Sequence, residues 1–214
     1  MPKSPSNQAV ATMADLAGCL TSRIDELSER LVDRILTTDE VYREAGIVPR
    51  EQLRQATHDN LLEHLTALSI LPSRDDGLRA SARATARRRA EQGLPLENLL
   101  RAYRLGGRIV WEGLLEECRA RPNPPKDELM EAAVLVWDTT DEYSAEITRT
   151  YRKAEDEILS RDKSQRQTLL RGLLTGMATD RDLAMAGKVL DLPNTGPYLV
   201  ALADIQDETS AAVR

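Results

Sequence analysis

The chain has 214 residues, 41% of them hydrophobic and 30% charged, with a formal net charge of −6. This composition is typical of a water-soluble protein with one full domain and part of a second, and the acidic charge argues against general affinity for nucleic acid. Phenylalanine is absent and aromatic residues total 3%, which argues against aromatic platforms for RNA or flat cofactors. Neither a membrane-spanning apolar run nor a signal peptide is recognisable. We therefore expect a cytoplasmic protein with no membrane partner.

Apolar residues recur at helical spacing through most of the chain, which predicts an all-α fold. A first helix is expected over residues 8–37. A second begins at Pro49 and ends before Pro72, and an Arg-rich helix follows over residues 75–92. We expect the two cysteines, which lie on helical patterns, to be buried, reduced thiols.

The most informative segment covers residues 93–114. Gly93 is typical of a helix stop and Pro95 of a first helical turn. The helix that begins there contains Gly106 and Gly107, and each glycine costs roughly 1 kcal/mol relative to alanine. The pair therefore indicates that another backbone passes close to this helix.

The longest periodic run follows a proline-rich break at residues 122–125. Its apolar positions alternate between steps of three and four, which makes a heptad-like seam. The seam consists of Leu129, Ala133, Val136, Thr140, Tyr143, Ile147, Thr150, Ala154 and Ile158. A helix of about 35 residues would be about 50 Å long, more than a compact domain requires. We therefore expect a homodimer through this long helix.

Weaker patterns begin near Ser164. Residues 168–176 predict a short helix with a glycine stop, residues 180–191 another helix, and Tyr198–Ala203 a strand. One strand cannot form a sheet. We therefore expect a helical sensor and dimerisation domain over residues 8–160, followed by the incomplete start of another domain over residues 164–214.

The segment at 93–114 resembles the N-terminal domain of RsbR-type stressosome proteins, which also heads many actinobacterial PucR/CdaR-like transcription regulators. Leu169–Leu174, Leu190–Pro193 and Gly196–Val200 resemble the motifs that open the GGDEF-like domain of those regulators. The resemblance implies a globin-like helical sensor without haem, with a long last helix and a truncated α/β GGDEF-like domain after it. The helix-turn-helix normally found at the end of such regulators is missing here.

These features predict the N-terminal sensory and dimerisation region of a PucR/CdaR-like regulator, which would reach DNA only through the missing C-terminal domain. The alternative is a stressosome-like scaffold with no DNA-binding role. The signal, a small molecule or a protein, is not identified by the sequence. Catalytic motifs are absent, so we expect no enzyme activity.

Candidate ligand-binding residues surround the glycine pair, because sensor pockets are often built between packed helices. They are Tyr103, Arg104, Gly106, Gly107, Trp111 and Trp137. Core packing is the competing interpretation, since aromatic side chains also fill space beside close helix crossings. The two interpretations do not exclude one another.

Eight arginines between residues 79 and 108 form a second candidate, a site for an anion or an acidic partner. They are Arg79, Arg83, Arg87, Arg88, Arg89, Arg101, Arg104 and Arg108. The competing interpretation is a solvated face paired with acids of the long helix, such as Glu142 and Glu146.

The two histidines, His58 and His64, are six residues apart on one helix and do not share a face, so they make no helical metal site. We expect them to be structural and exposed or partly buried, and we expect no metal and no cofactor.

We predict that the protein does not bind haem, because no phenylalanine is available to line a haem pocket and neither histidine has an apolar, aromatic setting. Hemin titration followed by absorption spectroscopy tests this. A stoichiometric Soret band that His58→Ala or His64→Ala abolishes would contradict it.

Overall fold

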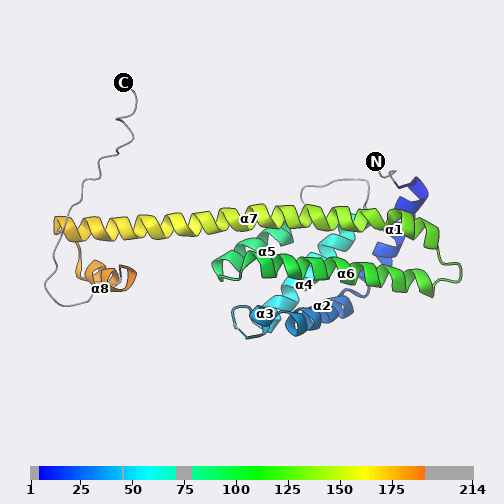
Figure 1. Cartoon of the computed structure of the whole chain (residues 1–214), viewed down its shortest axis with the longest axis horizontal. Helices are drawn as coiled ribbons and strands as arrows, with labels where there is room; N and C mark the ends of the chain where they lie inside the picture. Colours follow the sequence, from blue (N-terminus) through cyan, green and yellow to red (C-terminus); the bar gives the residue numbers. More distant parts are fainter. Residues whose placement is uncertain (1–4, 45, 71–78, 191–214) are drawn as a thin grey trace, which may run out of the picture. The chain divides into compact units, whose positions relative to one another are not determined.

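The computed structural model describes residues 5–44, 46–70 and 79–190, and its regular secondary structure there is helical (Figure 1). The helices are α1 (Asn7–Thr21), α2 (Ile24–Thr38), α3 (Glu40–Glu44), α4 (Arg50–Ser69), α5 (Ala80–Glu91), α6 (Leu96–Ala120), α7 (Lys126–Thr175) and α8 (Asp180–Val189). The all-α prediction is confirmed for these residues. The predicted strand at Tyr198–Ala203 lies outside them.

The chain divides into two compact units, Met1–Leu159 and Ser160–Arg214. Helix α7 begins in the first unit and ends in the second. It is longer than predicted, with 50 residues, because the segment at 168–175 continues the same helix and does not form a separate short one.

The helix predicted over residues 8–37 is two helices, and the prediction of one helix was wrong. The helix is interrupted at Ser22 and Arg23, because the backbone of Arg23 is not helical, with φ −107° and ψ 16°. The Arg23 guanidinium pairs with Glu26 at 2.8 Å and Glu117 at 2.8 Å. Asp25 and Glu26 occupy the first turn of α2, where carboxylates are favourable. The break lets α1 and α2 pack separately against α4.

Helix α6 lies between α2 and the first part of α7 (Figure 1). A Cβ atom on residue 106 would lie 3.5 Å from Leu31 Cδ2 of α2. On residue 107 it would lie 2.7 Å from Thr140 Oγ1 of α7, closer than real Cβ contacts. The predicted close approach at the glycine pair is therefore confirmed, and the two neighbouring glycines face different helices.

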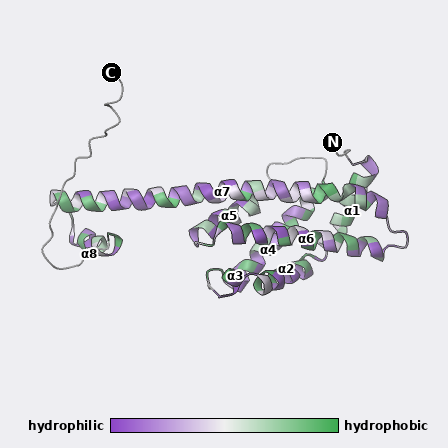
Figure 2. Ribbon diagram, in the orientation of Figure 1, coloured by the Kyte–Doolittle hydropathy of each residue, from purple (hydrophilic) through white to green (hydrophobic). Residues whose placement is uncertain are grey.

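The apolar seam of α7 is covered largely within one chain. Leu129, Val136 and Ile147 are at most 1% exposed, and they belong to the same core as the buried residues of α1, α4 and α6. Figure 2 shows hydrophobic positions recurring along α7 among hydrophilic ones. The seam that we expected to face a second copy therefore packs against the other helices of its own chain.

The described part of the second unit is a helical hairpin. Gly176, with φ 68°, ends α7 as predicted, and Met177 N donates to Gly172 O at 3.1 Å. Thr179 caps α8, which packs on the end of α7 through the buried residues Leu169 and Ala186.

The cysteines differ in burial. Cys118 is buried in α6 as predicted, whereas Cys19 is exposed on α1, so that prediction was wrong. The buried face of α1 consists of Ala9, Thr12, Met13, Leu16, Ala17 and Leu20. Cys19 lies at the edge of this face, where the helix surface is open to solvent.

We predict that Gly107→Ala lowers the free energy of unfolding by about 1–3 kcal/mol, because the new methyl group overlaps Thr140. Thr140 cannot easily move, since its side chain is β-branched and its hydroxyl donates to Val136 O at 2.8 Å. The matched control is Gly18→Ala on α1, where nothing lies within 4 Å of the added atom. It should raise stability by about 0.5–1 kcal/mol.

Urea unfolding of both variants measures these changes. Adding Thr140→Ala to Gly107→Ala should recover part of the loss. Equal stability of Gly107→Ala and the wild type would show that the α6–α7 contact tolerates a side chain.

Candidate functional site

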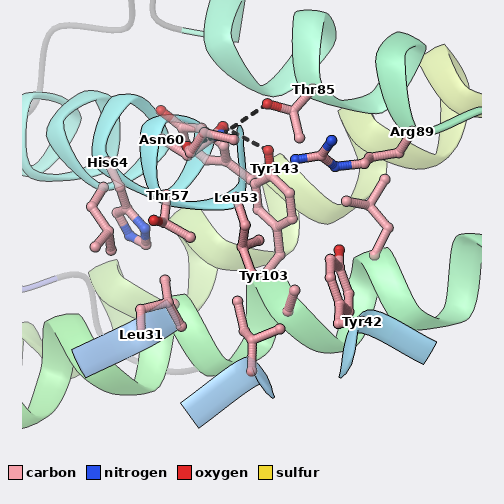
Figure 3. Close-up of a pocket in the computed structure, with 16 residues that line it drawn as sticks. Leu31, Tyr42, Leu53, Thr57, Asn60, His64, Thr85, Arg89, Tyr103 and Tyr143 are labelled. Atoms are coloured by element: carbon pink, nitrogen blue, oxygen red, sulfur yellow. Dashed lines mark hydrogen bonds between the residues drawn. The ribbon is translucent and has the colours of Figure 1, made fainter. Parts of the chain in front are cut away.

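The first unit contains a cavity of about 50 Å³ bordered by side chains from α2 to α7 (Figure 3). Its lining residues are Leu31, Ile35, Tyr42, Leu53, Ala56, Thr57, Asn60, Leu61, His64, Thr85, Arg89, Leu99, Ala102, Tyr103, Gly106 and Tyr143. This volume is enough for a few waters or one small molecule. Apolar walls with a few fixed polar groups are typical of ligand sites.

A hydrogen-bonded chain orders one wall of the cavity. The Tyr103 hydroxyl donates to Asn60 Oδ1 at 2.6 Å, and Asn60 Nδ2 donates to Thr85 Oγ1 at 3.0 Å (Figure 3). Asn60 Nδ2 also donates to Ala56 O at 2.6 Å, which fixes the orientation of the amide. Burial raises the pKa of Tyr103, so its hydroxyl remains protonated at neutral pH.

Arg89 supplies the cationic group of the cavity, and its side chain is buried with only 1% exposed. It lies in the last turn of α5, on the same face as Ala82 and Ala86. Gly93, with φ 73°, ends this helix, and Leu94 N donates back to Arg89 O at 3.0 Å. This C-terminal motif fixes the backbone from which the guanidinium extends.

The guanidinium of Arg89 has more donors than acceptors around it. Nη1 donates to Gln92 Oε1 at 2.6 Å, and Nη2 makes a long contact of 3.5 Å with Gln52 O. The Tyr42 hydroxyl also interacts with the group. Among the described residues, Nε has no partner and no carboxylate forms an ion pair with Arg89. Burial lowers the pKa of Arg89, but a guanidinium remains charged in proteins.

His64 forms another part of the cavity wall and is 7% exposed, so the prediction of an exposed or partly buried histidine was wrong for this residue. Its ring stacks on Tyr143 of α7, with centroids 5.5 Å apart. Within the described part of the chain its Nε2 has no hydrogen-bond partner. Burial lowers the pKa of His64 to about 4, so the ring is neutral at physiological pH.

The candidate residues named from the sequence occupy different places. Tyr103 and Gly106 line the cavity, while Gly107 lies at the contact with α7. The remaining three do not line it: Arg104 is exposed, Trp111 packs partly buried against the core, and Trp137 is 48% exposed. The structure therefore brings two of these candidates to the cavity wall.

Three of the eight arginines in the cluster pair with acids of the long helix, as the paired-face interpretation expects. Arg79 pairs with Glu142, Arg83 with Glu146 at 3.7 Å, and Arg87 with Glu157 at 2.9 Å. Arg89 differs because it turns inward. Its spacing from Ala82 and Ala86 is the helical i, i+4, i+7 pattern, and this was the sequence signal that could have separated it from its neighbours.

In the described part of the chain, no group of three histidine, cysteine, aspartate or glutamate residues is placed to hold a metal ion. None of the described helices combines the length and the apolar character needed to cross a membrane.

Residues 25–166 match the family model of the RsbT co-antagonist protein rsbRD N-terminal domain. The chain belongs to this family. Comparisons with curated proteins and with solved structures gave no match. The rsbRD-type domain covers α2 to α6, the cavity and most of α7, which makes this part of the chain a sensory, stressosome-type N-terminal domain. The resemblance seen at residues 93–114 is confirmed at this level.

We predict that His64 makes the rsbRD-type domain less stable in mild acid. Its folded pKa of about 4 lies below the ordinary value of 6.5, so between these values the unfolded chain binds a proton and the native state does not. The stabilisation is fully present above about pH 6.5 and is lost toward pH 4, at about 1.4 kcal/mol per pH unit.

Urea unfolding at several pH values between 7 and 4 measures the effect. His64→Phe, which keeps a ring to stack on Tyr143, should flatten the slope. His58→Gln, on the same helix but partly exposed, should leave it in place. Identical slopes for His64→Phe and the wild type would rule out this role of burial.

Proposed function

We propose that this chain is the N-terminal sensory and dimerisation region of a PucR/CdaR-like transcriptional regulator and has no enzymatic activity. The observation that supports the proposal most is that α7 contributes Tyr143 to the cavity wall and continues as one helix to Thr175. A group that enters the cavity would therefore contact a helix that also belongs to the second unit. Such a regulator would contact DNA through a domain outside this chain.

The proposed signal changes the contact between α6 and α7. Tyr103 and Gly106 of α6 face the cavity, and the adjacent Gly107 contacts Thr140 of α7. A ligand that binds one arrangement of this crossing more tightly than another shifts the population toward it. Because interfaces packed this closely adopt discrete arrangements, a small change at the cavity can be passed on as a displacement of α7.

Dimerisation requires a surface other than the buried seam of α7. Met130 is 67% exposed and Trp137 is 48% exposed, and they lie two helical turns apart on the same face of α7. Exposed large apolar side chains at this spacing are typical of helix–helix association. We propose that this face joins two copies of the chain. The same surface also suits the alternative function, a stressosome-like scaffold, if it builds a larger assembly.

Native mass spectrometry and sedimentation velocity test the proposed function. We expect a dimer that Trp137→Glu converts to monomer while circular dichroism remains helical. Arg104→Glu, at an exposed position on α6, is the control and should remain dimeric.

Ile147→Asp should instead lower the helix content, because Ile147 is fully buried in the core. A large assembly would favour the scaffold over the regulator. A wild-type monomer at all concentrations would contradict dimerisation.

A further inference from the structure

We propose that the cavity binds a small planar anion, a short carboxylate or an oxyanion of similar size, with Arg89 as its principal partner. This inference rests on the proposed sensory function and identifies the chemical class of its signal. It starts from the one cationic side chain that lines the described cavity.

The first argument is charge. Arg89 is 1% exposed, yet among the described residues no carboxylate pairs with it. A buried cation without a counter-ion is unfavourable, and buried charges in proteins are normally paired. The C-terminal end of α5, where Arg89 lies, supplies only a partial negative charge. An anion in the cavity would complete the neutralisation.

The second argument is geometry. The Nε–Nη2 edge of Arg89 is the least satisfied, since Nε has no described partner and the contact of Nη2 with Gln52 O is long, at 3.5 Å. Two parallel N–H donors on one edge match the two oxygens of a carboxylate or of a planar oxyanion. Figure 3 shows the guanidinium reaching in from α5, with the hydroxyl ends of Tyr42 and Tyr103 pointing toward the same side.

The third argument is size and selectivity. A volume of about 50 Å³ suits a ligand of a few non-hydrogen atoms, smaller than a nucleotide or a sugar. The carboxylate of Glu63 does not line the cavity. Its Oε2 accepts from Ser81 N at 2.9 Å at the start of α5, and its buried Oε1 has no described hydrogen-bond partner. Leu31, Leu53 and Leu99 also line the cavity and would surround the small apolar end of an acetate-like molecule.

Isothermal titration calorimetry of the whole chain with formate, acetate, nitrate and chloride at constant ionic strength tests the proposal. We expect saturable binding of one planar anion per chain, with little or no binding of spherical chloride. Tighter binding of formate or acetate than of nitrate would indicate an organic acid, and the reverse order would indicate an inorganic oxyanion. The anions should raise the midpoint of thermal unfolding in the same order as their affinities, because a ligand that binds only the native state stabilises it.

Arg89→Met should weaken binding by about tenfold or more, the usual loss for hydrogen bonds to a charged group. The matched control is Arg88→Met, the exposed neighbour, which should bind as the wild type does. Tyr42→Phe removes one hydroxyl beside Arg89 and should weaken binding more modestly, which provides a second variant if Arg89→Met folds poorly. Without anion, a folded Arg89→Met should melt no lower than the wild type, since the variant removes an unpaired buried charge.

Binding that is lost in the Arg89 and Tyr42 variants and kept in Arg88→Met supports the site. No binding to the wild type, equal binding of chloride, or unchanged binding by Arg89→Met overturns it. These outcomes do not depend on the oligomeric state, so the anion site can fail while the proposed sensory dimer stands, or the reverse.

Discussion

Helix α6 is approached closely from two sides because two neighbouring positions carry no side chain. Gly106 admits Leu31 of α2, and Gly107 admits Thr140 of α7, at distances that a methyl group at residue 107 would not allow. The cavity depends on this arrangement, since Gly106 forms part of its wall and the position of α7 places Tyr143 against His64. The roughly 1 kcal/mol that each glycine costs in helix stability is therefore offset by tight packing at the centre of the domain.

The charged groups of the domain have two different physical roles. Arg23, which precedes α2, and Arg30 of α2 pair with Glu116 of α6 at the surface, and such exposed pairs contribute at most about 1 kcal/mol each. Arg89 is buried among neutral groups, where an unpaired charge costs far more. A domain needing stability alone would be served as well by an apolar side chain here, so the buried guanidinium is better explained by a ligand than by packing.

Local rules in the sequence predicted the fold class, the glycine contact and the helix ends at Gly93 and Gly176. They failed where the outcome depends on tertiary partners. At the break, Arg23 pairs with carboxylates of α6 more than ninety residues away, and helical periodicity does not report such contacts. From the sequence we placed Arg89 with the exposed arginines, because a local excess of arginine does not show which side chains point into the core. Only Tyr103 and Gly106 of the predicted ligand-binding residues line the cavity. The glycine pair predicted where two helices cross, but it did not predict the cavity beside the crossing.

The long seam of α7 shows how an apolar pattern can be read correctly and assigned to the wrong partner. Periodicity states that one face of a helix is buried, but not whether a second copy or the same chain buries it. Here the chain covers the seam itself through α6 and its neighbours, and this internal burial gives α7 its connection with the cavity. If the seam were a dimer interface, Tyr143 and Thr140 would contact a partner, and α7 would not contribute Tyr143 to the cavity wall. A helix whose apolar face belongs to the sensor core leaves the face beside it, with the exposed Met130 and Trp137, for association.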